Sequence, residues 1–354
     1  MKVEIHKIMI LIGYMHYRKQ PVKSKKAYVY AAAAKAEGAE LLFFSPGAVD
    51  FENKKINGYI YKNGEWIKIS SVFPDVICNV TPFSNRKQVD TSDKLQKTIP
   101  FTSNSIGDKT TVYKNIMKYK EFSNYFVPSE KVLSFKHFYN LLDKYDEIVF
   151  KPENGHQGID VYYIKKIKDY FKIILGNEQT NYDLKELSDF ISDKLRKEDY
   201  ILQPYIHSRT KSGNSYDFRL HVQKNRKGEW TIGKIYPRIA EAGSIVCNLC
   251  SGGYTCELKD FLKKEFGGDD HNIKKYIENF SLQIAEHMDK IQKELYQQEL
   301  DELGIDIGLD EKQKIWIYEI NWRPGYPPSM NADLDIAKNI IGYAMFLAEK
   351  NIIK

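Results

Sequence analysis

The sequence predicts an α/β fold of the mixed (α+β) kind, in which a small N-terminal α/β domain precedes longer antiparallel units. Near the start, an apolar strand, an alanine-rich helix and a second apolar strand follow one another, which is the order of a parallel α/β unit. Further along, alternating strands come in pairs joined by short polar turns, which is typical of antiparallel hairpins. At 354 residues the chain is also long for one hydrophobic core, so we expect two or three packed units.

The first predicted domain comprises residues 1–105. Lys62-Asn63-Gly64-Glu65 supplies the Asn-Gly pair that a tight hairpin turn favours, between strands at 59–61 and 66–69. A small parallel sheet accompanies this hairpin, with strands expected at 8–13, 41–44 and 76–80 and a helix at 27–37.

Two further units are predicted at 106–200 and 201–354. The first contains strands at 147–151 and 161–165, separated by a polar loop, with helices at 109–122, 135–145 and 184–197. A strand-like segment at 200–206 leads into the second. That unit contains the hairpins 216–224 with 230–240 and 303–309 with 315–320, and helices at about 275–299 and 334–350.

The charge pattern argues against a dedicated nucleic-acid binder. The net charge of +6 comes from 53 basic and 47 acidic side chains with no dense basic block, and a mildly basic surface suits polyanions such as nucleotides. No run approaches the roughly twenty apolar residues that cross a bilayer, and the start lacks the apolar core of a signal peptide. We therefore expect a cytoplasmic protein that binds neither membrane nor nucleic acid.

The cysteines give a weak metal signal. Cys78 is isolated, whereas Cys247, Cys250 and Cys256 cluster and include a Cys-x-x-Cys pair, which raises zinc or redox chemistry. A second pair and nearby histidine ligands are missing. We favour reduced core or loop cysteines.

The segment from Ile315 to Gly325 carries the strongest chemical signal. Its alternating apolar run delivers Glu319 and Asn321 to one face of a strand before the chain breaks at Pro-Gly. If the hairpin register brings Asp306 of the preceding strand opposite that pair, three oxygen ligands converge, which suits Mg²⁺ beside a triphosphate. Carboxylates so placed would repel one another without cations, and this repulsion is the reason to infer a metal. The alternative is an edge strand with solvated polar residues.

Lys151 ends an apolar strand and precedes a loop bounded by Gly155 and Gly158. Backbone N–H groups of such a loop can close over phosphate oxygens while the ammonium group pairs with them. The loop has neither the Walker spacing nor a dinucleotide fingerprint. A plain strand exit with a glycine turn is the alternative.

Three charged residues on a second hairpin point to a common cleft. Asp217 and Arg219 alternate on one strand and Arg238 lies on its partner, so the arginines can offer donor forks to a phosphate or carboxylate. Ordinary cross-strand salt bridges are the alternative. Asn248 with Gly252-Gly253 then forms a polar stretch that either approaches a substrate or is a surface loop.

The order of these pieces resembles the ATP-grasp superfamily, most closely its YheC/YheD branch of endospore coat-associated proteins. The resemblance covers roughly residues 106–330 and implies a two-subdomain ATP-grasp module with antiparallel sheets after the N-terminal domain. Its parts are Asp108-Lys109, Lys151-Pro152 with the glycine loop, Gln203-Pro204-Tyr205-Ile206, Asp217-Phe218-Arg219, Arg238, Asn248-Leu249 with Gly252-Gly253, residues 302–308, Glu319-Ile320-Asn321 and Arg323-Pro324-Gly325.

The resemblance implies a role for each matched residue. Lys109, Lys151 and the loop of Gly155 and Gly158 would contact ATP phosphates, with Gln203, Tyr205 and Ile206 at the adenine and Asp217 at the ribose. Asp306, Glu319 and Asn321 would hold Mg²⁺, and Arg219, Arg238 and Asn248 would stabilise an acyl phosphate or substrate carboxylate. The tail 325–331 would join the acceptor pocket, and His156 would either touch the γ-phosphate or stay exposed.

The function implied is an ATP- and Mg²⁺-dependent, ADP-forming carboxylate–amine ligase. Its partners would be a carboxylate and an amine from the small molecules, amino acids or peptides. No catalytic triad is evident, which agrees with chemistry that needs positioning and charge screening. Two alternatives remain open: a small-molecule kinase on the same scaffold, and a spore-coat-associated protein that binds nucleotide without turnover.

Overall fold

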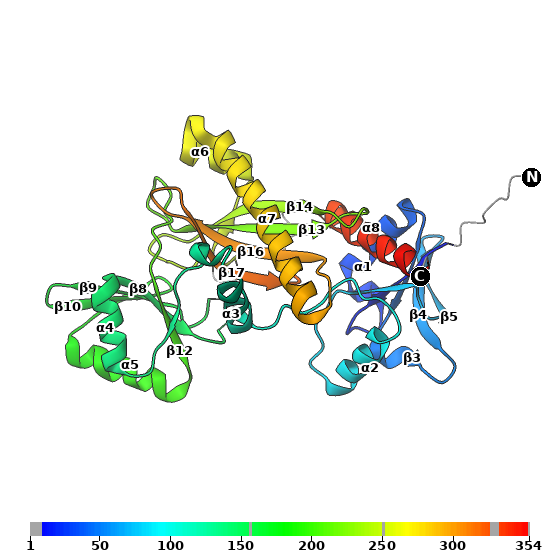
Figure 1. Cartoon of the computed structure of the whole chain (residues 1–354), viewed down its shortest axis with the longest axis horizontal. Coiled ribbons are helices and arrows are strands. Elements are labelled where there is room, and N and C mark those ends of the chain that lie inside the picture. Colours follow the sequence, from blue (N-terminus) through cyan, green and yellow to red (C-terminus); the bar gives the residue numbers. More distant parts are fainter. Residues whose placement is uncertain (1–8, 156–157, 250–251, 326–332, 353–354) are drawn as a thin grey trace, which may run out of the picture.

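The protein is described by a computed structural model that covers residues 9–155, 158–249, 252–325 and 333–352. Three β-sheets succeed one another along its longest dimension (Figure 1). We call them the first, second and third sheets in the order in which the chain builds them. The third sheet lies in the middle, between the other two. The architecture is a mixed α/β fold with antiparallel sheets, as predicted.

The first sheet has a parallel centre and an antiparallel edge. Its strand order is β3-β4-β2-β1-β6, with β5 paired to β4. The parallel strands are β1 (Leu11–Met15), β2 (Glu40–Phe44) and β6 (Val76–Asn79), and the antiparallel ones are β3 (Val49–Asp50), β4 (Lys55–Lys62) and β5 (Glu65–Val72). The predicted Asn63-Gly64 turn joins β4 to β5, and both residues have positive φ, as a tight hairpin turn requires.

Two helices cover opposite faces of the first sheet. Helix α1 (Lys25–Ala36) shares a buried core with Ile12 and Tyr14 of β1. Helix α2 (Arg86–Gln96) contributes Leu95 to a different core, which contains Met15. Because side chains alternate along a strand, these two cores lie on opposite faces of β1. The predicted strands and the helix at 27–37 are present, whereas α2 was not predicted.

The second sheet is antiparallel, in the order β11-β10-β9-β8-β12-β7. Residues of α4 and α5 pack on one of its faces in a single core. Side chains of Asp183 and Glu186 form a capping box that starts α5. The elements are β7 (Glu130–Lys131), β8 (Glu147–Pro152), β9 (Tyr162–Ile167), β10 (Tyr170–Leu175), β11 (Glu178–Tyr182), β12 (Tyr200–Pro204), α3 (Lys109–Tyr119), α4 (Phe135–Tyr145) and α5 (Leu184–Lys197).

The third sheet follows the order β15-β14-β13-β16-β17. Alternation turns Phe218, Leu220 and Ile305 toward the long helix α7, where they form the largest core, and leaves the polar side chains on the opposite face. The elements are β13 (Tyr216–Lys224), β14 (Trp230–Ile239), β15 (Tyr254–Thr255), β16 (Glu302–Leu309), β17 (Ile315–Trp322), α6 (Leu258–Phe266) and α7 (Asp270–Tyr296). Short 3-10 helices lie at Pro21–Lys23, Pro46–Ala48, Ser123–Tyr125 and Gly267–Asp269.

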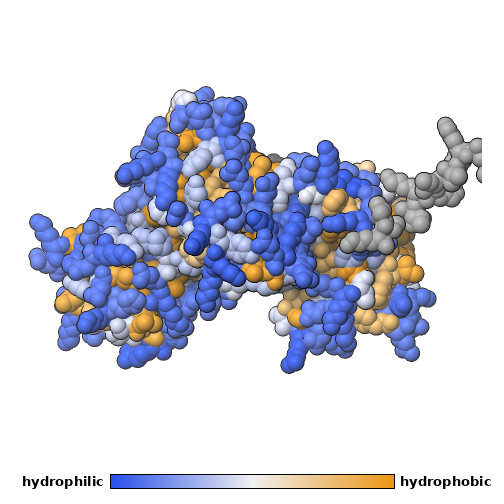
Figure 2. All heavy atoms as spheres, viewed as in Figure 1, coloured by the Kyte–Doolittle hydropathy of each residue, from blue (hydrophilic) through white to orange (hydrophobic). Residues whose placement is uncertain are grey.

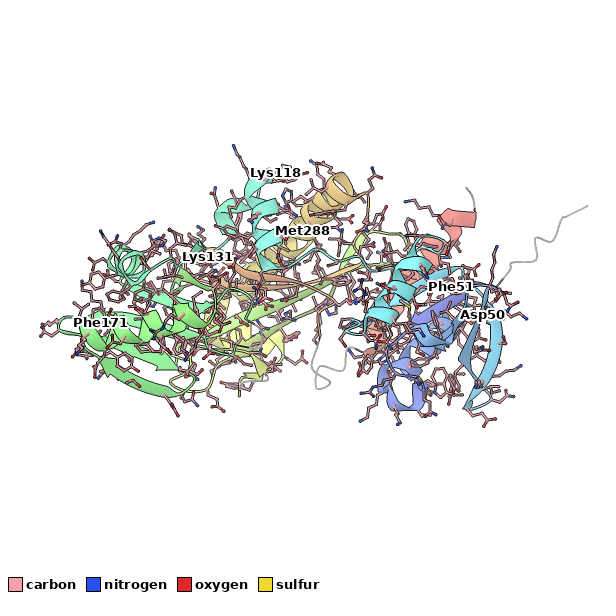
Figure 3. The ribbon with its side chains drawn as sticks, turned by 90° about the horizontal axis from the view of Figure 1, so that it is seen from below. Asp50, Phe51, Lys118, Lys131, Phe171 and Met288 are labelled. Atoms are coloured by element: carbon pink, nitrogen blue, oxygen red, sulfur yellow. The ribbon has the colours of Figure 1, made fainter. Side chains whose placement is uncertain are left out.

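The last helix, α8 (Asp333–Ile352), returns to the first sheet. Ile336, Ile340 and Ile341 are buried against the alanines of α1, whose small side chains let the two helices approach closely. Figures 1 and 3 both show α8 beside the first sheet. Gln223 at the end of β13 also donates to the Ile336 carbonyl at 3.5 Å. Helix α8 therefore joins the end of the chain to its beginning, and the division at residues 105 and 200 stays a prediction.

Charged and polar residues cover most of the face seen in Figure 2, with apolar residues scattered among them. In the described part of the chain, no helix has both the length and the apolar character that crossing a membrane would need.

Candidate functional site

A cavity of about 780 Å³ lies between the second and third sheets. A space of this size matches small-molecule and cofactor sites in general. All fourteen residues predicted for the site line it: Lys109, Lys151, Gly155, Gly158, Gln203, Tyr205, Ile206, Asp217, Arg219, Arg238, Asn248, Asp306, Glu319 and Asn321. The structure thus brings together residues that are up to about two hundred positions apart in sequence, while their individual roles stay predictions.

Two lysines from separate elements reach the cavity. Lys109 is the first residue of α3, which Asp108 caps by accepting a hydrogen bond from the Thr111 N–H at 2.7 Å. The Lys109 ammonium donates to the Gly155 carbonyl at 2.6 Å and lies 3.2 Å from a Glu319 carboxylate oxygen. It therefore bridges the glycine loop of the second sheet and the last strand of the third.

Lys151 lies near the end of β8, opposite Ile201 of β12. Burial lowers the pKa of the Lys151 ammonium to about 8; the nearby charge of Lys109 acts in the same direction and Glu319 opposes it. The nearby carboxylate of Glu319 therefore offsets only part of the cost of burying the positive charge of Lys151.

The late hairpin brings its oxygen donors to one face. Asp306 of β16 lies directly opposite Glu319 of β17, and Asn321 lies opposite Gly304. A bulge at this point gives β17 one extra residue, Tyr318. The expected register between Asp306 and the Glu319–Asn321 pair is therefore confirmed.

The bulge also resets the alternation of β17. Ile315 and Ile317 are buried in the core, so strict alternation would send Glu319 to the same side. With one residue inserted, Ile320 faces the core, and Glu319 and Asn321 face the cavity. The extra residue, Tyr318, lines the cavity as well.

Arginines hold the two aspartates. Arg238 donates to both carboxylate oxygens of Asp217, at 2.6 and 2.7 Å, and its Nη2 lies 3.0 Å from Asp306. Arg219 forms a second fork with Asp306 through Nε and through Nη2, the latter at 3.0 Å. Burial alone would raise the pKa of Asp306, but the positive charges of Arg238 and Arg219 hold it below its ordinary value. The cross-strand salt bridges considered above are thus present inside the cavity.

The charged side chains that line the cavity balance one another without a metal ion, apart from one excess positive charge. Of the residues that the structure describes, five cationic and four acidic ones line the cavity: Lys109, Lys151, Arg219, Arg238 and Arg323 against Glu153, Asp217, Asp306 and Glu319. The inference that a metal is needed to relieve carboxylate repulsion does not hold in this structure, because the protein's own cations already relieve it. Such a site attracts a polyanion before it attracts a free divalent cation.

The donor set nevertheless suits Mg²⁺ once phosphates are present. Among the described residues, no three His, Cys, Asp or Glu side chains are grouped to hold a metal ion by themselves. Asp306 and Glu319 offer carboxylates, and Asn321 adds an amide oxygen on the same face. Magnesium is commonly bound by one or two carboxylates together with substrate phosphates, so the residues fit that ion.

The strand β12 and the residues after it form the opposite wall. Gln203, Tyr205 and Ile206 line the cavity, and the Tyr205 N–H donates to the Glu147 carbonyl at 2.9 Å. The Tyr205 hydroxyl lies 3.1 Å from the Ser215 hydroxyl. These contacts fix the position of the backbone from Gln203 to Ile206, which we call the backbone edge. It lies beside apolar side chains such as Val149, and this environment suits a flat heterocycle.

The loop after β14 closes one side of the cavity. Asn248 and Cys247 both line it, and the Gly253 N–H donates to the Asn248 carbonyl at 3.2 Å. A Cβ at Gly253 would lie 2.5 Å from the Cys247 carbonyl oxygen, so only glycine fits there. The described cysteines, Cys78, Cys247 and Cys256, are free thiols. Cys250, His156 and the tail 326–331 lie outside the described residues.

Sequence reasoning gave no role to several side chains in the wall, among them Tyr236 and Tyr318, and it quoted Arg323 only as part of the matched Arg323-Pro324-Gly325 segment. Tyr236 lies two residues before Arg238, so alternation along β14 could have identified it. Arg323 follows β17 with a φ of 52°, and its guanidinium stacks 3.9 Å from the centre of the Trp322 ring. Burial lowers the pKa of Arg323 to about 10, against the opposing influence of Asp301 and Glu302.

Comparison with known proteins identifies relatives over most of the chain. A family model described as YheC/D-like ATP-grasp matches residues 98–347. Two proteins of Bacillus subtilis strain 168 are similar. Endospore coat-associated protein YheD is 25% identical, in an alignment that covers 89% of this chain and 72% of that protein. Endospore coat-associated protein YheC is 24% identical, with coverage of 90% and 89%.

Solved structures share the fold. D-alanyl-alanine synthetase A from Vibrio cholerae aligns with a TM-score of 0.55 at 10% identity, covering 98% of this chain and 99% of that one. A RimK domain ATP-grasp protein from Sphaerobacter thermophilus gives 0.52 at 8% identity, covering 95% and 99%. The D-alanine-D-alanine ligase from Coxiella burnetii gives 0.50 at 11% identity, covering 97% of each. These similarities confirm the predicted fold and the resemblance to ATP-grasp proteins.

Proposed function

The chain belongs to the YheC/D-like ATP-grasp family, and from that membership we propose that it is an ATP- and Mg²⁺-dependent ligase that joins a carboxylate to an amine. The observation that carries the proposal is the cavity itself. Two lysines, a backbone edge and an oxygen-donor hairpin from distant segments meet around about 780 Å³ of space. The family match and two fold neighbours that are named as D-alanine ligase and synthetase support the same reaction class.

In the first step, a substrate carboxylate oxygen attacks the γ-phosphorus of ATP. The bond from that phosphorus to the β–γ bridging oxygen breaks, which gives an acyl phosphate and ADP. Lys109 and Lys151 contact the phosphates, and the edge from Gln203 to Ile206 holds the adenine. Positioning and charge screening supply the catalysis, because the chain needs no covalent nucleophile for this transfer.

In the second step, the amine nitrogen attacks the acyl carbon, the carbon–oxygen bond to phosphate breaks, and the nitrogen loses a proton. The paired donors of Arg219 and Arg238 hold Asp306 and Asp217, which fixes both guanidinium groups in the cavity, where their positive charges suit the negative charge that develops on the acyl group. When bound beside Asp306, Glu319 and Asn321, Mg²⁺ would neutralise charge on the transferring phosphoryl group.

We expect the Lys109 ammonium to change its ion-pair partner, from Glu319 to a phosphate, when a nucleotide binds. This ammonium lies 3.2 Å from a Glu319 carboxylate oxygen and neutralises that carboxylate. An incoming triphosphate draws the ammonium away and leaves the carboxylate to a cation that accompanies the phosphates. This exchange favours joint binding of ATP and Mg²⁺ over binding of Mg²⁺ alone.

A second candidate is a spore-associated protein that binds nucleotide without turnover. Its support is the naming of both Bacillus subtilis relatives as endospore coat-associated. The internal pairing of all three carboxylates favours it too, since compensated charges persist without catalysis. A small-molecule kinase would use the same nucleotide site with a hydroxyl acceptor.

The test is product analysis with purified protein, ATP, MgCl₂ and a panel of amino acids and short peptides. We expect ADP and phosphate release that depends on substrate, and an amide product by mass spectrometry. Glu319→Gln is expected to lower the rate roughly 100-fold, because it removes a charged ligand of the phosphate-bound cation.

The matched control is Glu311→Gln, which changes an exposed carboxylate in the turn of the same hairpin and should leave the rate unchanged. A phosphorylated product would establish the kinase. Substrate-dependent AMP formation would reject the acyl-phosphate route, and nucleotide binding without turnover across the panel would favour the spore-associated alternative.

A further inference from the structure

The first sheet has a topological switch point of its own. Strands β2 and β6 lie on either side of β1 and run parallel to it, while α1 and α2 cover opposite faces. In open α/β sheets of this kind, ligands bind outside the carboxyl ends of the strands, where the strand order reverses. Here that point lies between the ends of β1 and β6. A hydrogen bond from the Tyr17 N–H to the Thr81 hydroxyl, 3.3 Å long, joins the segment that follows β1 to the segment that follows β6.

The chain that leaves β1 at this point is strongly basic. Residues 14–36 contain no Asp or Glu, and neither do residues 80–89 after β6. Four exposed cations, Arg18, Lys19, Lys23 and Lys25, follow β1 within ten residues, and we call them the basic edge. Arg86 and Lys87 begin α2 after the exit of β6.

The basic edge is uncompensated. Within the described ranges, none of its four members pairs with a carboxylate. The Arg18 side chain contacts Tyr17, through a 3.0 Å hydrogen bond to the hydroxyl and a cation–π contact at 5.5 Å, and its backbone N–H donates to His16 Nδ1 at 2.9 Å. The next cation, Lys26, is exposed too, but partial desolvation lowers the pKa of its ammonium and the nearby carboxylates of Glu302 and Asp333 oppose that change. The four members of the basic edge therefore stay available to an external anion.

A short chain of contacts connects the carboxyl end of β6, which lies beside that of β1, to the cavity. Asn79, the last residue of β6, exchanges two hydrogen bonds with the backbone of Ser103, at 2.8 and 3.1 Å. The Ser103 hydroxyl accepts the Trp322 indole N–H at 2.5 Å. Trp322 and its neighbours Asn321 and Arg323 line the cavity. The carboxyl end of the first sheet thus abuts the part of the cavity formed by β17.

We propose that the basic edge binds an anionic group of the ligase substrate, so that this enzyme acts on a molecule carrying a carboxylate or phosphate in addition to the group that reacts. The inference rests on the proposed ligase function, because that function supplies the substrate. A peptide-like molecule with acidic side chains has the right chemistry: its reacting end enters beside Asn321 and Arg323, and its charged end lies against the basic edge.

The experiment measures equilibrium binding of triglutamate and, as an uncharged analogue of similar shape, triglutamine to the full chain by calorimetry. Inorganic phosphate and tripolyphosphate are tested as competitors, so that a phosphate site is distinguished from a carboxylate site. The variant Arg18→Gln with Lys19→Gln removes two exposed cations of the basic edge. The control Lys62→Gln with Lys68→Gln removes two exposed cations from the β4–β5 hairpin.

We expect triglutamate, or one of the phosphate anions, to bind more tightly than triglutamine, with an affinity that falls as salt is added. The Arg18 and Lys19 double variant should weaken that binding about tenfold, as expected for two exposed ion pairs. Its ATP affinity and the behaviour of the Lys62 and Lys68 variant should stay unchanged. Equal binding of charged and uncharged probes, or full binding by the Arg18 and Lys19 variant, would overturn the inference.

The failure of the ligase proposal would look different. Anion binding that depends on Arg18 and Lys19, without ADP formation from any substrate, would leave the binding site in place and remove the reaction. ADP formation with equal rates for acidic and neutral substrates, unaffected by the Arg18 and Lys19 changes, would keep the reaction and reject this site.

Discussion

Lys151 shows how one side chain couples the cavity to pH. Its pKa lies at about 8 because burial and the neighbouring Lys109 disfavour its charge. A bound triphosphate favours the charged form and so raises that pKa. At pH 7 the ammonium of the free protein is already protonated, whereas above pH 8 ATP binding must take up a proton.

We therefore predict that the ATP dissociation constant is flat below pH 8 and rises by up to about tenfold per pH unit above it. Calorimetry between pH 7 and 9.5, in buffers of different ionisation enthalpy, measures both the affinity and the proton uptake. Lys151→Arg should remove the dependence, since an arginine stays charged throughout this range. A flat profile for the original protein would contradict the assigned cause.

The sequence predicted which residues meet, but not how they pair. Alternation placed Asp217, Arg219 and Arg238 on facing strands, and they do line one cavity. The partner of each arginine depends on register across three strands: Asp217 lies opposite Arg238, and Arg219 opposite Asp306. A period of two fixes the face of a side chain but not its neighbour on the next strand, so the ion pairs had to come from the structure.

The helices and strands differ in how clearly the sequence pattern predicts them. Helices α4 and α5 begin and end where predicted, because each has a capping residue and a clear apolar face. Helix α2 was missed because only Leu95 of it is buried. Strand β11 was missed because four of its five residues are exposed. Elements with little apolar surface give the sequence pattern little to detect.

The bulge in β17 is a second feature that the sequence pattern could not predict. Simple alternation predicted that Glu319 and Asn321 share a face, which is correct. It also places Glu319 with Ile315 and Ile317, which is wrong because Tyr318 is the inserted residue. Bulges recur beside functional sites, where they redirect a side chain, and this one turns Glu319 toward the cavity.

The junction of β13, α7 and α8 depends on a buried lysine. Lys224 ends β13 with 2% of its side chain exposed, and its ammonium lies 2.9 Å from Asp289 and 3.3 Å from Glu299. The ring of Tyr343 from α8 lies 5.3 Å away. Removal of this cation takes away the buried partner of both carboxylates and leaves them to half-exposed lysines such as Lys293, 2.9 Å from Asp289 and 3.9 Å from Glu299.

We predict that Lys224→Met lowers the free energy of unfolding by about 3 kcal/mol. Lys350→Met is the matched control, because Lys350 lies at the same 3.3 Å from Glu299 but half of its side chain is exposed. Its loss should cost less than about 1 kcal/mol. Urea titrations of both variants make the comparison, and equal effects would show that burial does not decide the contribution.

At the scale of the whole molecule, the cavity depends on two sheets that the chain builds far apart. One polar contact crosses between them near the loop that carries Asn248. The Asn177 amide, at the turn between β10 and β11, donates to Glu241 at 2.7 Å. Both residues are exposed, so this contact can break without disturbing either core.

We predict that Asn177→Ala speeds nucleotide release about fivefold, since a typical hydrogen bond contributes about 1 kcal/mol. The free energy of unfolding should fall by no more than that amount, because the contact joins two exposed residues. Stopped-flow displacement of a fluorescent ATP analogue measures the release rate. Asn181→Ala alters an exposed asparagine of the same hairpin that takes no part in this contact. The idea fails if both variants release nucleotide at the original rate.

The sequence predicted the types of sheet better than the contacts between distant parts of the chain. Two kinds of strand order predicted a parallel first sheet followed by antiparallel ones, and the structure has both. The contact between Asn177 and Glu241 could not be predicted, because it joins exposed loops whose positions follow from packing elsewhere. The same holds for the link from Asn79 through Ser103 to Trp322.

Helix α8 has a consequence for the newly made chain. Ala27, Ala31 and Ala34 of α1 are made long before Ile336, Ile340 and Ile341 of α8, with which they share one buried core. While the ribosome is still adding the intervening three hundred or so residues, the part of that core that α8 supplies is missing. The core that α1 shares with the first sheet can be completed only after translation has passed α8, so this early-made part of the fold has to wait for one of the last segments described.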